Sequence, residues 1–304
     1  LSLLFVPPAE GGGMEIIMNY LRFIKLEFKL KAVKNFKPKG YAGNKLRGAI
    51  GTAMNKLFCD EDKVHCEKCD EHCVYERVFK PVVNNTEFTT SPAPFVIEMS
   101  EFDKAEIKKG EELSFSIVVF GERVSFWKEL LEAVVYSFEK GDKIFNASFE
   151  IVKAISAMER RVIWEDGKVV AIPSAALWKD DIVEDIYGYS FDEMKIKVRF
   201  LSPLLLKEDV TKEWKFEDFI DAVFYRIGSI IDLYEDCRFC VIYGLLCRKP
   251  YIKTEIISLK DNKPEFIIEG DLKRYLSYIE MGSNLHIGKK TTYGFGHYEY
   301  KIIE

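Results

Sequence analysis

The stretch LHIGKKTTYGFGHYEY, residues 285–300, places three glycines and two adjacent lysines directly before a short alternating segment. From His297 onward, apolar and polar residues alternate as they do in a β-strand. Glycine weakens a strand interior, so Gly288, Gly294 and Gly296 indicate a loop whose bare backbone must lie close to something else. The lysines and threonines between the glycines are residues that contact phosphates, which favours a nucleic acid as that neighbour. A tight turn leading into an edge strand is the alternative explanation.

The second half of the chain, which this loop completes, shows the order strand, helix, strand, strand, helix, strand. That order is typical of a ferredoxin-like unit. Residues 236–250 fit no element of this order. The predicted elements are a strand at 193–203, a helix at 216–236, hairpin strands at 251–259 and 264–270, a helix at 271–281 and a strand at 297–303.

The first half repeats the same order. Its first helix carries apolar residues at helical spacing, with Asn44 as the expected N-cap. The predicted elements are a strand at 25–31, a helix at 44–57, extended segments at 94–99 and 113–120, a helix at 125–141 and a strand at 147–156. We therefore predict an α+β protein of two tandem ferredoxin-like domains. These are residues 14–156, with a Cys-rich insert at 59–73, and residues 193–304, with a glycine-rich loop at 288–296; a linker or irregular region occupies 157–192.

Length and composition are those of a globular protein. The chain has 304 residues, of which 48% are hydrophobic and 31% charged, which suits about two domains. No apolar run approaches the ~18 residues of a membrane helix. The first residues lack the basic segment of a signal peptide, so we expect a cytoplasmic protein that starts naturally at Met14 or Met18.

Charge is distributed unevenly along the chain. The net charge is −5, yet residues 22–47 carry nine basic residues against one acidic residue. One basic face on an acidic body predicts a nucleic-acid partner at one place, and a solvated strand face is the alternative. The predicted RNA-binding residues are Lys25, Lys29, Lys31, Gly288, Lys289, Lys290, Thr291, Thr292, Gly294 and Gly296.

Four cysteines lie in one hydrophilic loop, separated by six, two and three residues. Four thiolates can hold one structural zinc in tetrahedral geometry, with His65 or His72 as substitute ligands. A disulfide and free thiols are the alternatives. Four protein ligands leave zinc no open position, so we expect no catalytic role for the metal. The predicted ligands are Cys59, Cys66, Cys69 and Cys73.

Three segments carry a resemblance to a known family. RGAIGTAMNKLFC with CEKCDEHCVYERVF follows the first strand, VRFLSPLLLKED opens the second half, and LHIGKKTTYGFGHYEY precedes the last strand. Together with the two predicted units, these segments resemble the CRISPR repeat-RNA processing endoribonucleases of the RAMP superfamily, in a branch with a four-Cys insert. The resemblance covers nearly all of residues 20–304.

The resemblance implies metal-independent cleavage of precursor CRISPR RNA within the repeat. The ribose 2′-OH attacks the adjacent phosphate and leaves a 2′,3′-cyclic phosphate and a 5′-OH, with no cofactor for catalysis. The implied partners are repeat RNA or crRNA and other subunits of CRISPR effector complexes. The alternative function is a non-catalytic RAMP subunit that binds crRNA. An enzyme whose metal or redox chemistry uses the Cys loop is a third hypothesis.

The expected catalytic residues depart from those of the family. Relatives commonly carry a catalytic histidine in or near the first helix, whereas this chain has no histidine between residues 1 and 64. Some members use lysine, arginine and tyrosine instead. The candidates are therefore Tyr41 for proton transfer or positioning and Lys45 and Arg47 for charge stabilisation. His286 and His297, which bracket the glycine loop, are the next candidates.

Overall fold

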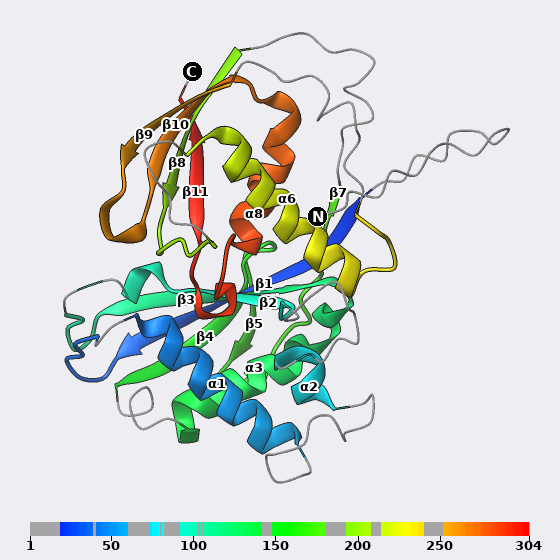
Figure 1. The fold of residues 1–304 in the computed structure, drawn as a ribbon. Helices are drawn as coiled ribbons and strands as arrows, with labels where there is room; N and C mark the ends of the chain where they lie inside the picture. The colour runs from blue at the N-terminus through cyan, green and yellow to red at the C-terminus, as the bar shows by residue number, and fades with distance from the viewer. Residues whose placement is uncertain are drawn as a thin grey trace, which may run out of the picture.

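The structure is a computed structural model in which two sheets, each covered by helices, lie one above the other (Figure 1). The predicted natural start at Met14 or Met18, the interior of the Cys-rich loop and residues 240–251 lie outside the described residues. Residues 19–38, 41–59, 73–79, 81, 92–102, 104, 106–141, 148–179, 193–207, 214–239 and 252–303 are described.

The N-terminal sheet is built around β1 (Tyr20–Ala32), whose alternating residues bury one side chain in two. Its strands run in the order β2-β3-β1-β4-β5-β6, with β7 also paired to β1, and the strand pairs among the described residues are antiparallel. The first four strands have the ferredoxin-like arrangement. The other strands are β2 (Phe95–Glu98), β3 (Glu112–Phe120), β4 (Phe149–Ser156), β5 (Arg161–Glu165), β6 (Lys168–Val169) and β7 (Ala176–Lys179).

The segment predicted as linker or irregular, 157–192, contains β5, β6 and β7, which extend the N-terminal sheet. These strands have five, two and four residues, which is too short for an alternating pattern to stand out in a sequence. Their pairing with β4 and β1 is a tertiary feature. The strands β5, β6 and β7 within residues 161–179 therefore belong to the N-terminal sheet.

One face of the N-terminal sheet is covered by α1 (Ala42–Phe58), α2 (Val74–Phe79) and α3 (Trp127–Tyr136) (Figure 1). The core between sheet and helices contains Phe28, Leu46 and Leu130, all fully buried. Helix α1 begins two residues before the predicted start, and its N-cap is Tyr41 rather than Asn44. The N-cap side chain makes no capping hydrogen bond, so packing of the buried first turn, not a polar cap, sets where this helix begins.

The C-terminal sheet has the order β11-β8-β10-β9, again antiparallel and again ferredoxin-like. The prediction of two tandem ferredoxin-like units is confirmed. The elements are β8 (Glu193–Phe200), α6 (Phe216–Tyr234), β9 (Lys253–Ser258), β10 (Glu265–Asp271), α8 (Leu276–Leu285) and β11 (Tyr298–Ile302).

The two units share a hydrophobic core. Phe23, Val118 and Phe120, on the face of the N-terminal sheet opposite α1, pack in one cluster with Ile227 of α6 and Tyr278 of α8. Two polar contacts also cross the junction. Arg22 Nη2 lies 2.6 Å from Glu235 Oε2, and the Tyr234 hydroxyl donates a hydrogen bond to the Pro92 carbonyl at 2.7 Å. This packing fixes the connection between α8 and β11 at the junction (Figure 1).

Within the described ranges, no helix combines the length and the apolar character needed to cross a lipid bilayer.

Candidate functional site

The glycine loop, residues 286–297, connects α8 to β11. Five of its residues have positive φ, including two that are not glycine, His286 at 56° and Lys290 at 59°. Its backbone is tied to the segment after β8, since the Lys289 N–H donates to the Leu205 carbonyl at 2.7 Å and Gly296 donates to Pro203 at 2.9 Å. These backbone hydrogen bonds therefore anchor the loop to the segment after β8.

The glycines of this loop are required by close intramolecular contacts. A Cβ on Gly288 would lie 2.5 Å from the Leu205 carbonyl oxygen, and one on Gly294 would lie 2.6 Å from that of Ile97. A Cβ on Gly296 would lie 1.8 Å from the Ile287 carbonyl oxygen. Gly294 and Gly296 are also buried, which corrects the expectation that their bare backbone makes room for RNA. The neighbour that needs a bare backbone here is another part of the chain.

The start of α1 packs directly on the loop. The Tyr41 hydroxyl donates to the Gly294 carbonyl at 2.8 Å, and the Tyr41 ring lies 4.6 Å from the Phe295 ring. A Cβ on Gly43 would lie 2.0 Å from the Tyr293 carbonyl oxygen. Of the predicted catalytic residues, Tyr41 is thus part of the contact between helix and loop.

Arg47 makes the second link between α1 and the loop. Its Nε donates to Thr292 Oγ1 at 3.1 Å. Its guanidinium lies between two aromatic rings, 4.7 Å from the centroid of Phe79 and 4.5 Å from that of Tyr293. By contrast, half-buried Lys45 has no hydrogen bond or ion pair with the part of the chain that the structure describes. The contacts give Arg47 a positioning role and leave Lys45 able to meet a ligand; a catalytic role for all three residues stays a prediction.

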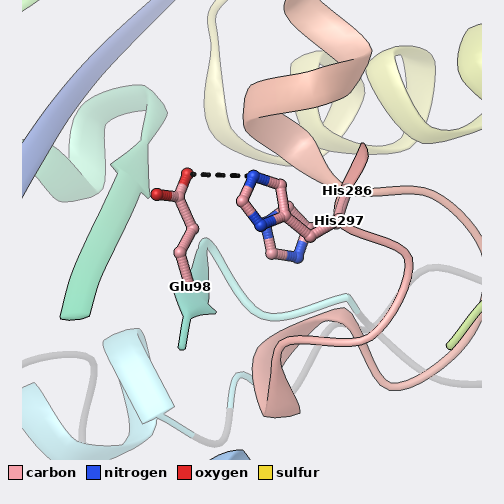
Figure 2. A group of neighbouring side chains, drawn as sticks. All are labelled: Glu98, His286 and His297. Atoms are coloured by element: carbon pink, nitrogen blue, oxygen red, sulfur yellow. Dashed lines mark ion pairs between the residues drawn. The ribbon is translucent and has the colours of Figure 1, made fainter. Parts of the chain in front are cut away.

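A second group of polar side chains gathers where the first and last residues of the loop meet (Figure 2). Figure 2 shows the Glu98 carboxylate directed toward the His297 ring, with the His286 ring stacked against it. Glu98 Oε1 lies 4.0 Å from His297 Nε2, and the two imidazole centroids lie 4.6 Å apart at an interplanar angle of 10°. Lys25 Nζ lies 2.9 Å from Oε1 and 2.7 Å from Oε2 of Glu98. We call these four residues the His–Glu–Lys cluster.

Burial sets the protonation of the two histidines. His286 is fully buried, and neither of its ring nitrogens has a hydrogen-bond partner among the described atoms. The pKa of His286 lies well below its ordinary value. Burial is the largest cause, and the nearby His297 and Arg226 charges lower the pKa further. Burial also lowers the pKa of His297, although the Glu98 carboxylate opposes that change. Both imidazoles are consequently neutral at neutral pH.

The donor atoms of Glu98, His286 and His297 lie within 4.8 Å of one another, a spacing that suggests a metal site. The geometry does not fit one. An imidazole binds a metal in the plane of its ring, and two stacked rings 10° from parallel cannot both direct a nitrogen at one ion. In addition, the Lys25 ammonium already contacts both oxygens of the only carboxylate in the group. The cluster is better suited to moving protons.

The edge strand β2 separates this cluster from the start of α1. Successive strand residues point to opposite faces. Ile97 belongs to the core beneath α1, whereas Glu98 lies on the other face, where it meets Lys25. The glycine loop passes around this edge, contacting Tyr41 on one side and contributing His297 on the other. The protein therefore has two candidate sites, one on each face of β2.

The predicted RNA-binding lysines of β1 share the face that carries the cluster. Their position follows from the alternation of β1, in which Leu26, Phe28 and Leu30 occupy the α1 side. Lys29 Nζ lies 2.5 Å from Glu27 Oε1, and Lys31 is exposed. In the loop, Lys289 and Lys290 are exposed, Thr292 is half-buried and Thr291 is buried. The β1 lysines thus lead toward His297.

The predicted zinc ligands are only partly covered by the described residues. Cys59 directly follows α1, and its N–H donates to the Asn55 carbonyl at 3.1 Å. Cys73 directly precedes α2, and its carbonyl accepts a hydrogen bond from Arg77 at 3.0 Å. Cys66 and Cys69 lie outside the described residues. A metal in this loop stays a prediction.

Comparison with solved structures places the fold among Cas6 chains. A chain of a partial Cas6-RT-Cas1–Cas2 complex has a TM-score of 0.56 at 9% identity, over 93% of this chain and 46% of its own length. A chain of the Cas6-RT-Cas1–Cas2 complex has the same TM-score and identity, with 29% of its length covered. A Cas6 chain in a product complex has a TM-score of 0.50 at 11% identity, over 92% of this chain and 100% of its own length. This chain thus spans less than half the length of the first two, and at these identities the likeness shows a shared fold.

No curated protein matches the sequence. Residues 21–176 match the AF_1859_N family, which is described as an N-terminal domain. This match starts at the beginning of β1 and ends at the first residue of β7, so it spans the whole N-terminal sheet up to that strand. Because it covers half of the sequence, the chain belongs to the AF_1859_N family.

Proposed function

We propose that this protein is a CRISPR precursor-RNA processing endoribonuclease that cleaves within the repeat without a metal cofactor. The observation that carries the proposal is the tandem ferredoxin-like fold shared with chains of Cas6 structures, one of which is described as a Cas6 product complex. The resemblance of the glycine loop and of the segment after β8 to the repeat-RNA endoribonucleases adds to it. The expected products are a 2′,3′-cyclic phosphate and a 5′-OH.

RNA binding is attributed to the basic residues that the protein leaves exposed. Lys31, Lys289 and Lys290 have no ion pair with the described residues, and half-buried Lys45 adds a cation near the start of α1. A helix N-terminus also favours a phosphate through its dipole and free N–H groups. Each phosphate contact with single-stranded RNA should add about −0.7 to the slope of log K, where K is the RNA-binding constant, against the logarithm of the salt concentration. Lys289→Ala combined with Lys290→Ala should therefore flatten this slope by about 1.4.

A non-catalytic RAMP subunit of a crRNA-guided effector complex is the second candidate function. One observation favours it: Tyr41 and Arg47, two of the residues expected to act at the start of α1, are occupied by the glycine loop. Such a subunit would keep the RNA-binding surface and would not cut.

Incubating the purified protein with labelled RNA that carries the repeat of a CRISPR array from the same genome tests both functions. EDTA is present throughout, and a matched RNA with a single 2′-deoxy substitution at the cut position is the control. The endoribonuclease should cut the first RNA to a cyclic phosphate and leave the second intact. Tight binding without cleavage would select the effector subunit, and cleavage of the 2′-deoxy RNA would exclude the 2′-OH mechanism.

A further inference from the structure

The His–Glu–Lys cluster contains more titratable groups than a structural contact requires, and it lies on the face that carries the basic strand. We propose that His297 and Lys25 are the proton-transfer pair of RNA cleavage, and that Glu98 and His286 position them. This inference rests on the endoribonuclease function proposed above. The chemistry would then occur on the face of β2 that carries this cluster, and not at the start of α1 on the other face.

One carboxylate oxygen lies near both reacting groups. Glu98 Oε1 lies 2.9 Å from Lys25 Nζ and 4.0 Å from His297 Nε2. The second oxygen, Oε2, lies 2.7 Å from the same ammonium. The carboxylate thus fixes the ammonium through both oxygens, and Oε1 lies close to His297 Nε2 but beyond hydrogen-bond distance.

The His286 ring supports the imidazole of His297 by stacking against it. Its ring is fully buried and nearly parallel to that of His297, so it cannot touch RNA and acts as a platform. Its backbone is held at a φ of 56°, which non-glycine residues rarely adopt, and strain of this kind persists only where the surroundings enforce it. The surroundings here are the end of α8 and the glycine loop.

The electrostatics suit a base and a cation side by side. The charged or titratable groups facing His297 are Glu98 on β2, Lys25 on β1, Glu299 on β11 and His286. Burial keeps the pKa of His297 below its ordinary value, so the imidazole is neutral and able to accept a proton. The adjacent ammonium supplies both positive charge and a proton.

The reaction balances without any other reactant. His297 Nε2 takes the proton of the ribose 2′-OH while the 2′-oxygen forms a bond to phosphorus. The bond between phosphorus and the 5′-oxygen breaks, and that oxygen takes a proton from Lys25 Nζ. The products are a 2′,3′-cyclic phosphate and a 5′-OH. His297 then gives its proton to solvent water and Lys25 takes one from it, which restores the starting state.

RNA can reach the two reacting groups. The Lys25 side chain is 25% exposed and that of His297 is 15% exposed, whereas their positioning partners are more deeply buried. Lys29 and Lys31 continue from Lys25 along the same face of β1. A strand of RNA that follows these lysines would arrive at the cluster.

Single-turnover cleavage of the repeat RNA tests the assignment. His297→Ala and Lys25→Ala should each slow cleavage about 10²- to 10⁴-fold, the usual contribution of a general acid or base, with binding changed only a few-fold. A substrate with sulfur in place of the 5′-oxygen at the cut needs no acid, because a thiolate leaves without a proton. It should restore cleavage by Lys25→Ala to within about tenfold of wild type and should not restore His297→Ala.

Two further variants separate chemistry from structure. Lys25→Arg keeps the positive charge but cannot give up a proton, so it should stay slow on the normal RNA and recover on the sulfur substrate. Lys128→Ala, on α3 behind the opposite face of the sheet, is the matched control and should cut at the wild-type rate. His286→Phe keeps an aromatic platform and should cut within about tenfold of wild type, with a shifted pH–rate profile.

The outcomes are distinguishable. Wild-type rates for His297→Ala and Lys25→Ala would overturn this assignment and leave the endoribonuclease function intact. Equal loss in both variants with no recovery on the sulfur substrate would make the cluster structural and also overturn it. A wild-type protein that binds the repeat and never cuts it would overturn the endoribonuclease proposal and this assignment with it.

Discussion

Replacing Arg47 by alanine should cost more stability than replacing any ordinary surface arginine. In the folded chain its guanidinium lies between the rings of Phe79 and Tyr293, at 4.7 and 4.5 Å from their centroids, and its Nε donates to Thr292. Each cation–π contact in a half-buried setting contributes about 1 kcal/mol, and the hydrogen bond about 1 kcal/mol more. Arg47→Ala should therefore lower the free energy of unfolding by about 3 kcal/mol.

Urea denaturation followed by far-ultraviolet circular dichroism measures this loss, and two variants calibrate it. Arg77→Ala removes a single ring contact, 5.0 Å from Phe126, and should cost about 1 kcal/mol. Thr292→Val removes only the acceptor of the hydrogen bond and should also cost about 1 kcal/mol. In the double variant the two losses should fall short of additivity, because Arg47 and Thr292 are in contact.

The same variant separates positioning from catalysis at the start of α1. If Arg47 positions the loop, its loss should lower stability and slow cleavage indirectly, by a factor similar to that of Thr292→Val. An Arg47→Ala protein as stable as wild type but about 100-fold slower in single-turnover cleavage would refute this reasoning. That result would support the sequence-based prediction of a catalytic Arg47.

Three other outcomes follow from the structure. Gly294→Ala should lower the free energy of unfolding by clearly more than Gly110→Ala. Both glycines have positive φ, but only at Gly294 would the added Cβ have a carbonyl oxygen and a hydroxyl oxygen within 2.6 Å. Equal losses of stability in chemical denaturation would contradict this contact. Burial holds the pKa of His286 below its ordinary value, so the folded state resists protonation. The contribution of His286 to the free energy of unfolding should be retained above about pH 6.5. Below that pH the free energy of unfolding should decrease, by at most about 1.4 kcal/mol per pH unit for this residue. His286→Phe should flatten this decline between pH 7.5 and 5.5. Protein purified without chelator should contain about one zinc per chain and lose it in Cys66→Ser, whereas a folded wild type free of metal would exclude the zinc prediction.

The element order was predictable because most elements are long enough to show their period. The α6 helix spans nineteen residues with a continuous apolar face, and β1 alternates over thirteen. The short strands β5, β6 and β7 escaped because their formation depends on pairing with β4 and β1. The helix start at Ala42 escaped for a similar reason, since contact with the glycine loop fixes it.

The glycine loop was visible in the sequence, but its role was misread in part. Glycines that admit a ligand and glycines that admit a neighbouring carbonyl look alike in a sequence, and only the fold shows that Gly296 lies against Ile287. Glu98 carried no signal, because it sits at the end of a four-residue strand 188 positions before His286. The histidines on either side of the loop were the one available hint that the second cluster exists.

Only substitutions that act on one face of β2 can show which face carries out the chemistry. Because the loop contacts Tyr41 on one side and supplies His297 on the other, a change within it, such as Gly294→Ala, disturbs both candidate sites. Loss of cleavage in a loop variant therefore cannot assign the reaction to either. Lys45 and Lys25 are the discriminating residues, since one lies at the start of α1 and the other pairs with Glu98 on the opposite face. Their alanine variants share the loss of one ammonium and differ in the face they affect. The variant whose cleavage recovers on the 5′-sulfur substrate identifies the face that protonates the leaving group.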